Sequence, residues 1–333
     1  MSCEPLIVLD GIEKTFTVRR KAGPFRREKR EVRAVDGISF TVDRGEMVGY
    51  IGPNGAGKST TVKMLTGILT PSGGRLRVAG IDPARDRTRL ARRIGVVFGQ
   101  RTTLWWDLPL RDSYRLVHRM YRIPDDRYRE NLARCVDLLD LGDLLDVPVR
   151  QLSLGQRMRG DIAAALLHDP EVLYLDEPTI GLDVVSKSRV RAFLRELNAE
   201  RGTTVLLTTH DLTDIEQLCS RVMVIDHGRL VYDGGLPGLH AAGDGERTLV
   251  VDLARAFPPI DSVPGARFVR AEGPRQYLAF PASASAAPLV AAVAEAYPLV
   301  DLSVREPDIE SVIAKMYGGA PGGTHEERRE SLM

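Results

Sequence analysis

The chain has 333 residues, 43% of them apolar, with 46 lysines and arginines against 45 aspartates and glutamates. This length predicts about two domains with real cores, and the formal net charge of +1 excludes general electrostatic binding of nucleic acid. Three cysteines without a C-x-x-C pair indicate a reducing cytosol. The first residues show no signal-peptide pattern. No run approaches the about 18 apolar residues of a membrane span, so we expect any membrane-spanning segment to belong to another polypeptide.

The first hundred residues contain short strand patterns around residues 6–9, 38–42 and 75–78. Between the first two, residues 19–33 carry eight basic side chains against two acidic ones. We interpret this segment as a solvated hairpin tip. Contact with anionic headgroups or with a membrane protein is the functional alternative, because basic residues near such a surface are attracted to it.

An apolar strand pattern at residues 47–51 leads directly into a glycine-rich turn, and a helical pattern follows. Backbone N–H groups at such a turn point toward the mouth of the helix, where its positive end favours phosphate. Lys58 is expected to reach the β- and γ-phosphates, and the Ser59 hydroxyl to ligate Mg²⁺. The predicted phosphate-binding loop comprises Gly52, Pro53, Asn54, Gly55, Ala56, Gly57, Lys58, Ser59 and Thr60.

Two further strand patterns end in polar residues. Residues 172–175 are followed by Asp176 and Glu177. Asp176 is placed to hold Mg²⁺, and Glu177 is placed to polarise an attacking water molecule. The structural alternative is an acidic helix cap. Residues 204–209 end at His210, whose imidazole can donate to a γ-phosphate. Because a lone histidine at a strand end is usually structural, His210 has weight only within this set.

Between these motifs, residues 94–98 form a strand pattern, residues 110–121 and 128–141 read as helices, and Leu152-Ser153-Leu154-Gly155-Gln156 precedes a helical segment. Ser153 is a candidate N-cap. The order of the motifs, with Leu-Ser-x-Gly-Gln ahead of the strand that ends in Asp176 and Glu177, resembles that in the ATPase subunits of ABC transporters. The resemblance extends from about residue 6 to about residue 233.

The resemblance implies that two such domains bind ATP head to tail. Each nucleotide would lie between the phosphate-binding loop of one domain and the signature residues Ser153, Leu154, Gly155 and Gln156 of the other. It implies that Gln100 contacts Mg²⁺ and the attacking water, and that Asp183 lies in a loop crossing the dimer interface. Phe16 matches the aromatic residue that stacks on adenine, although an apolar residue in an N-terminal strand is by default a core residue.

One signature position departs from the family, because Leu154 stands where glycine is common. If Ser153 and the Gly155 backbone contact the phosphate, the Leu154 side chain can point away without harm. Otherwise one of two composite sites is impaired, as in an asymmetric heterodimer.

The expected fold class is α/β: a P-loop NTPase of ABC type, with a RecA-like core, an antiparallel β lobe and an inserted helical subdomain, plus a small C-terminal α+β domain. The expected domains are residues 1–235 for the ATPase, with its helical subdomain at about 101–160, a linker at 236–245, an accessory or dimerisation domain at 246–318, and a disordered tail at 319–333. The C-terminal domain is expected to contain strands at 248–253, 267–271, 276–280 and 300–304 and helices at 287–297 and 307–317.

The expected function is ATP hydrolysis that powers an ABC transporter, most similar to the drug and polysaccharide exporters. ATP and Mg²⁺ are the expected ligands, with Glu177, His210, Gln100 and Lys58 as catalytic residues and Ser59, Gln100 and Asp176 near the metal. The expected partners are separately encoded permease subunits and a second ATPase subunit, either identical or different. The chain is expected to lie in the cytoplasm, peripherally bound to the inner face of the cell membrane. Trp105 and Trp106, beside Gln100, are candidate anchors for a permease helix or packing residues between lobes. A soluble ABC ATPase acting on a cytosolic partner is the alternative. Import is left open beside export, and the transported substance cannot be read from this chain because specificity is expected to lie in the permease.

Overall fold

The computed structural model describes residues 4–21, 27–99, 101–209, 211–242, 246–261, 263–281 and 284–305. The chain divides into two compact units, Met1–Gly234 and Gly235–Met333. Within the part so described, no helix is long and apolar enough to cross a bilayer.

The centre of the first unit is a six-stranded sheet in the order β5-β6-β7-β3-β8-β9. Neighbouring strands from β5 to β8 run parallel, and β3, β6 and β7 consist almost entirely of buried residues, as expected for a sheet covered on both faces. The strands are β3 (Met47–Ile51), β5 (Ile94–Phe98), β6 (Val172–Asp176), β7 (Thr204–Thr208), β8 (Arg221–Asp226) and β9 (Arg229–Gly235).

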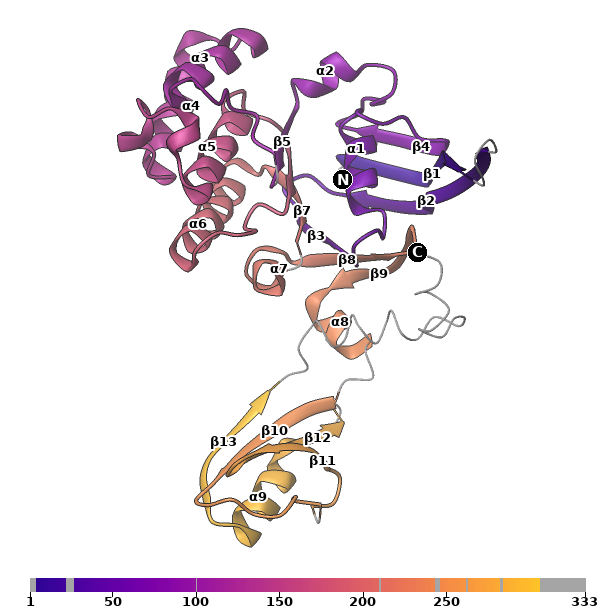
Figure 1. Cartoon of the computed structure of the whole chain (residues 1–333), viewed down its shortest axis with the longest axis vertical. Helices are drawn as coiled ribbons and strands as arrows, with labels where there is room; N and C mark the ends of the chain where they lie inside the picture. Colours follow the sequence, from indigo (N-terminus) through magenta and orange to yellow (C-terminus); the bar gives the residue numbers. More distant parts are fainter. Residues whose placement is uncertain are drawn as a thin grey trace. The chain divides into compact units, whose positions relative to one another are not determined.

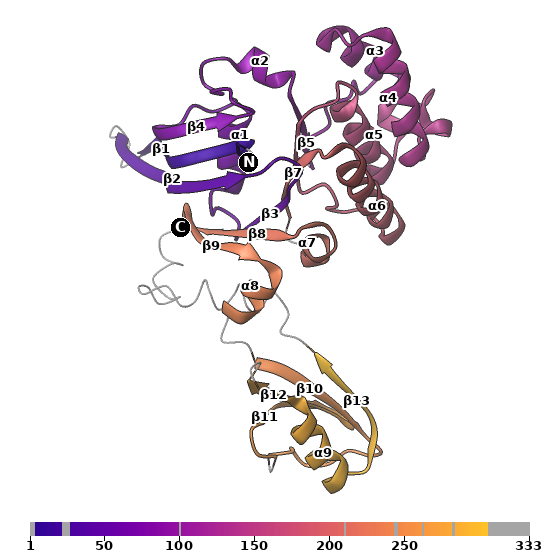
Figure 2. The same cartoon turned by 180° about the vertical axis from the view of Figure 1, so that it is seen from behind.

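A three-stranded antiparallel sheet in the order β2-β1-β4 flanks this core (Figures 1 and 2). Its strands are β1 (Ile7–Lys21), β2 (Arg27–Val42) and β4 (Gly73–Val78). Residues 19–33, interpreted from the sequence as a hairpin tip, do belong to an antiparallel β1–β2 hairpin, but most of the segment is strand, because β1 and β2 continue pairing as far as Lys21 and Arg27. Backbone pairing in a two-stranded ribbon tolerates a polar, charged sequence, so the basic composition concealed the strands.

Helices cover the parallel sheet and form a separate subdomain beside it (Figure 1). The subdomain contains α3 (Leu110–Tyr121), α4 (Asp125–Leu138), the short 3₁₀ helices η1 (Gly142–Leu144) and η2 (Val149–Gln151), and α5 (Leu154–Leu166). The remaining helices of this unit are α1 (Lys58–Leu65), α2 (Arg87–Ala91), α6 (Val184–Arg201) and α7 (Leu212–Leu218).

The two sheets of the first unit share one hydrophobic core. Ile7 and Ile38 from the antiparallel sheet belong to the same buried cluster as Tyr50 from β3, Leu65 from α1 and Tyr174 from β6. Burying such side chains stabilises the folded state by roughly 1.5–3 kcal/mol each. The antiparallel lobe and the parallel sheet are therefore parts of a single packed body.

The second unit is an antiparallel sheet in the order β11-β12-β10-β13, packed against helix α9. Its elements are α8 (Leu236–Ala242), β10 (Glu246–Leu253), β11 (Arg267–Glu272), β12 (Arg275–Pro281), α9 (Ala286–Ala296) and β13 (Leu299–Arg305). The helix expected at 307–317 and the tail expected at 319–333 lie outside the described residues. The α/β fold class predicted from the sequence, with its antiparallel lobe and parallel sheet, is confirmed.

Residues 236–245 were predicted to be a linker because they contain glycines and a proline, but most of this segment is the helix α8. Pro237 lies at the second helical position, where proline's fixed φ is compatible with a helix. Leu239, three residues after Leu236, is fully buried. Burial of this apolar side chain outweighed the weak helix propensity of the segment.

We expect Gly52→Ala to destabilise the first unit. A methyl group on Gly52 would lie 2.2 Å from the carbonyl oxygen of Ile225, so β8 would have to move. Such overpacking costs about 1–3 kcal/mol. The matched control is Gly142→Ala, since nothing lies within 4 Å of its added methyl. Urea unfolding of both variants is the measurement, and equal stability of the two would contradict this account.

Candidate nucleotide-binding site

The glycine-rich loop connects β3 to α1, and the backbone at two of its glycines is left-handed. Gly55 has φ 84° and Gly57, the N-cap of α1, has φ 109°. These values favour glycine because a Cβ atom would be strained there. No side chain caps the helix start, so its first N–H groups are oriented toward the loop. The loop thus has the backbone geometry that favours an anion at a helix N-terminus.

The Lys58 side chain folds over this loop. Its Nζ donates to the carbonyl oxygens of Gly52 (2.5 Å) and Pro53 (3.1 Å). Burial lowers the pKa of Lys58 below its ordinary value, while the nearby charges of Glu177 and Asp176 oppose this change. An ammonium held over the loop by two backbone carbonyls is placed to exchange them for phosphate oxygens.

The tip of β6 carries Asp176 and Glu177. Asp176 Oδ1 accepts a hydrogen bond from Thr208 Oγ1 on the neighbouring strand β7, which orients the carboxylate. Glu177 N donates to Thr208 O at 2.8 Å, and Glu177 has φ 55°. A left-handed backbone at a non-glycine residue costs energy and is concentrated at functional sites. Here it changes the chain direction immediately after the strand, so that Glu177 departs from the line of β6.

A cavity of about 460 Å³ brings these elements together. Its walls include Asn54 and Ser59 from the loop and helix α1, and Asp176 and Glu177 from β6. Lys63, Ile68, Phe98, Gly99 and Arg101 complete the lining. The Ser59 hydroxyl and the Asp176 carboxylate are hard oxygen donors, which Mg²⁺ prefers, and within the described ranges no cluster of three His, Cys, Asp or Glu forms a protein-only metal site. This donor set fits an ion held partly by phosphates.

The signature segment forms the start of helix α5. Ser153 is its N-cap: Ser153 Oγ accepts from Gln156 N (3.2 Å), and Gln156 Oε1 accepts from Ser153 N (2.8 Å). This reciprocal capping box satisfies two backbone donors. The structural interpretation of Ser153 is therefore correct, and it leaves the exposed first turn of α5 available for a second role.

Leu154 directs its side chain toward the loop that contains Asp183. A methyl group on Gly181 would lie 2.8 Å from Leu154 Cδ2, and one on Gly155 would lie 2.7 Å from Ser186 Oγ. The starts of α5 and α6 are thus packed directly on one another. Asp183 caps α6 by accepting from Ser186 N (2.9 Å) and Ser186 Oγ (2.7 Å), and these hydrogen bonds lower the pKa of its carboxyl.

The described structure does not place Gln100, His210 or Phe16 at this cavity. Gln100 and His210 lie outside the described residues, although their neighbours Gly99 and Thr209 are placed. Phe16 lies on β1 with 36% of its surface exposed, and the Lys14 ammonium is 5.2 Å from its ring. The default assignment of Phe16 to the core was therefore wrong.

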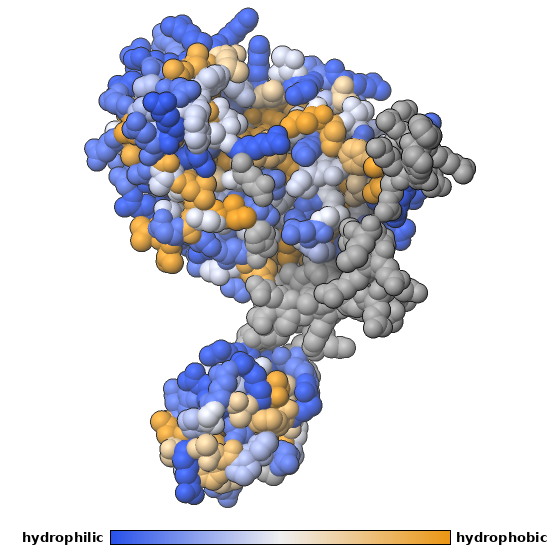
Figure 3. All heavy atoms as spheres, viewed as in Figure 1, coloured by the Kyte–Doolittle hydropathy of each residue, from blue (hydrophilic) through white to orange (hydrophobic). Residues whose placement is uncertain are grey.

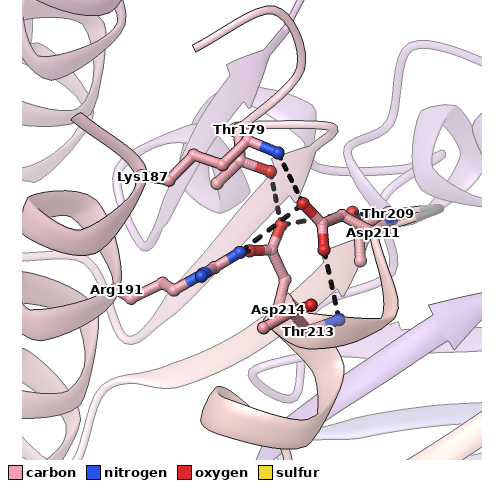
Figure 4. A network of polar contacts seen from close by, with 7 residues as sticks. All are labelled: Thr179, Lys187, Arg191, Thr209, Asp211, Thr213 and Asp214. Atoms are coloured by element: carbon pink, nitrogen blue, oxygen red, sulfur yellow. Dashed lines mark hydrogen bonds and ion pairs between the residues drawn. The ribbon is translucent and has the colours of Figure 1, made fainter. Parts of the chain in front are cut away.

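A buried polar network connects the segment after β6 with helix α6 and the segment after β7 (Figure 4). Asp214 is fully buried and accepts hydrogen bonds from Thr179, from Thr209 and from Arg191 Nε (2.6 Å). Asp211 accepts from Lys187 Nζ at 2.6 Å. Sequence reasoning missed this network because its members are spread over 36 positions, and only the i, i+4 spacing of Lys187 and Arg191 signals a shared helix face.

We expect Asp214→Asn to destabilise the first unit by roughly 3–5 kcal/mol, because breaking a buried pair leaves the Arg191 cation with only its longer, 3.5 Å contact to Asp211. The matched control is Asp10→Asn, which breaks an exposed pair with Arg75 and should cost less than about 1 kcal/mol. Urea unfolding monitored by circular dichroism measures both. Similar losses in the two variants would refute a special role for the buried network.

The sequence profile of the family described as ABC transporter matches residues 35–180. The daunorubicin resistance ATP-binding protein DrrA3 of Streptomyces coeruleorubidus is 38% identical over 245 residues, which cover 74% of this chain and 73% of that protein. A Nod factor export ATP-binding protein I of Ralstonia nicotianae is 39% identical, over 69% of this chain and 67% of that protein.

Solved structures agree with the sequence relatives. The ATP-binding cassette MJ0796, as a dimer in a post-hydrolysis state with ADP and Pi, superposes with a TM-score of 0.60 and 26% identity, covering 69% of this chain and 98% of that one. CbiO1 of Clostridium perfringens, part of the transporter complex cbiONQ, gives a TM-score of 0.59 and 29% identity, covering 71% of this chain and 91% of that one. The chain therefore belongs to the ABC transporter family, as an ATP-binding subunit with ATPase activity.

Proposed function

We propose that this chain is the ATPase subunit of an ABC exporter whose membrane path is formed by separately encoded permease subunits. The observation that carries this proposal is the cavity in which Ser59 of the phosphate-binding loop faces Asp176 and Glu177. The two relatives named above are a drug resistance protein and an export protein, which favours export over import.

In the proposed reaction, the loop backbone and Lys58 bind the β- and γ-phosphates of ATP. Mg²⁺ held by Ser59, Asp176 and Gln100 would neutralise phosphate charge. Glu177 orients a water molecule for in-line attack on the γ-phosphorus and accepts its proton. Lys58 and His210 stabilise the negative charge on the transferred phosphoryl group, with Phe16 against the adenine.

A second ATPase subunit completes each site. The start of α5 carries the exposed residues Ser153 and Leu154, and this helix N-terminus suits the γ-phosphate bound by the partner. Asp183 and the signature residues are adjacent within one chain, since Gly155 packs on Ser186. Closure of the dimer around ATP and reopening after hydrolysis would drive the permease.

An apolar groove supports docking of a permease. It has a volume of about 320 Å³ and lies between α2 and β5 on one side and α3 and α5 on the other. In the space-filling view apolar residues gather in the depression between these helices (Figure 3). Trp105 and Met120 line the groove and are 38% and 65% exposed. Trp106 instead lies 5.4 Å from the Arg157 guanidinium, so Trp105 is the better anchor.

The proposal places the chain in the cytoplasm, bound peripherally to the inner face of the membrane through its permease. The second unit would serve dimerisation or regulation, as a compact body with its own core.

We expect Glu177→Gln to reduce steady-state ATP turnover by about 10²–10⁴, because an amide cannot accept the proton of water. ATP binding should survive, since the phosphate contacts come from the loop. The control is Glu216→Gln on the exposed side of α7, which should leave turnover unchanged. Phosphate release and equilibrium binding of a fluorescent ATP analogue measure the two effects. Near-normal turnover in Glu177→Gln would overturn the assignment.

We expect Leu154→Gly to change turnover by less than about threefold, because the Leu154 side chain is directed at Gly181 rather than at the exposed helix start. Ser153→Ala should lower ATP turnover by more than Leu154→Gly does. It should also lower the free energy of unfolding by about 1 kcal/mol, because the helix loses its N-cap. Both are measured by phosphate release and thermal unfolding. A gain of tenfold or more in Leu154→Gly would show that Leu154 obstructs the composite site.

A further inference from the structure

We propose that a basic pocket at one end of the apolar groove recognises acidic side chains of the docked permease segment. This inference rests on the proposed function and adds the chemistry of the partner. The pocket has a volume of about 310 Å³, and its lining includes Arg92, Arg122 and Arg127. These residues come from the end of α2, the α3–α4 turn and the first turn of α4.

The basic pocket and the apolar groove are continuous. Tyr121 and His168 line both hollows, and their rings stack with centroids 4.2 Å apart. A hydrogen-bonding contact of 2.9 Å between His168 Nε2 and the Ile94 carbonyl oxygen attaches this pair to β5. A single segment lying in the groove can therefore reach both the apolar wall and the arginines.

Positive charge is concentrated around these hollows. Residues 87–129 contain eleven arginines, no lysine, and only four acidic residues, whereas the whole chain has a net charge of +1. Among the described residues, Arg92 and Arg122 make no ion pair, although nearby Arg93 pairs with Glu171. Asp169, which also lines the pocket, is paired with Arg201 (2.7 Å), and Arg127 is paired with Glu130 (3.4 Å). Neither carboxylate neutralises Arg92 or Arg122.

The shape favours a peptide over a membrane surface. The arginines adjoin a hollow lined by Trp105, Val117 and Met120, into which a flat bilayer cannot enter. Guanidinium groups bind carboxylates through two parallel hydrogen bonds, and aromatic and methionine side chains anchor apolar ones. The complementary partner is an amphipathic segment with apolar residues along one face and aspartate or glutamate at one end.

The two parts of the surface would contribute differently. Apolar anchors in the groove supply most of the affinity. Exposed arginine–carboxylate pairs add a few-fold each, fix which end of the segment lies at the α3–α4 turn, and accelerate association at low salt.

The test uses the full-length chain with Glu177→Gln, purified with ATP from detergent-solubilised membranes of its native host. A photoreactive amino acid at position 120 identifies the segment in the groove by mass spectrometry. We expect a cytoplasmic segment of a polytopic membrane protein that contains aspartate or glutamate. A cross-linked segment without acidic residues would overturn the inference and leave the proposed function intact. Recovery of no membrane protein would overturn both.

Charge reversal tests the arginines directly. The double variant Arg92→Glu/Arg122→Glu should bind the purified membrane protein roughly 10- to 30-fold more weakly, with unchanged basal ATP turnover. The control Arg195→Glu makes the same kind of change on the exposed side of α6 and should bind like the parent chain. Replacing the partner's acidic residue by lysine should restore binding to the double variant.

Two results would contradict the proposal. One is equal binding by the double variant and the parent chain. The other is arginine-dependent binding of the purified chain to vesicles of phosphatidylglycerol and phosphatidylcholine without any membrane protein, which would assign the pocket to lipid headgroups.

Discussion

The site depends on one constraint of parallel sheets: the carboxyl ends of adjacent strands meet at a single edge. β3, β6 and β7 end there: the phosphate-binding loop follows β3, Asp176 is the last residue of β6 with Glu177 directly after it, and Thr209 follows β7. Because β3 is held between β7 and β8, the start of the loop at Gly52 is fixed against the Ile225 backbone. The start of the phosphate-binding loop and the Asp176–Glu177 pair are therefore placed by the register of buried strands.

Much of this arrangement was predictable because the signals were local. The apolar run at 47–51 and the glycines after it define a strand and a turn by composition alone, and β3, β5 and α3 begin and end at the predicted residues. The confirmed fold class follows from these motifs and their order. The left-handed backbone at Glu177 and the hydrogen bond from Thr208 to Asp176 were not predictable, because tertiary packing imposes them on residues without a distinctive pattern.

The errors have a common physical cause. In β1 and β2 the charged ends of the strands pair through their backbones, which a composition-based interpretation does not detect. In α8 the glycines and proline disguised a helix held by the burial of Leu239. For Phe16, matched to the adenine-stacking aromatic, the alternative of a core residue was the one that failed, since the ring is exposed. Each case depends on which face of a helix or strand is covered by other parts of the protein. That is decided by tertiary packing and cannot be read from local composition.

The cavity and the groove share a wall, and this has a thermodynamic consequence. Ile68 and Phe98 line both hollows, so a ligand that displaces them from one side alters the surface presented on the other. If nucleotide binding changes the affinity of the groove for a permease segment, that segment must change nucleotide affinity by the same factor. Since packed side chains have few alternative arrangements, any displacement of Phe98 would occur between discrete positions rather than continuously. The buried Arg191–Asp214 network connects the segments after β6 and β7 to α6, whose start packs against the signature helix α5. This is the route by which a rearrangement at the cavity would reach that helix.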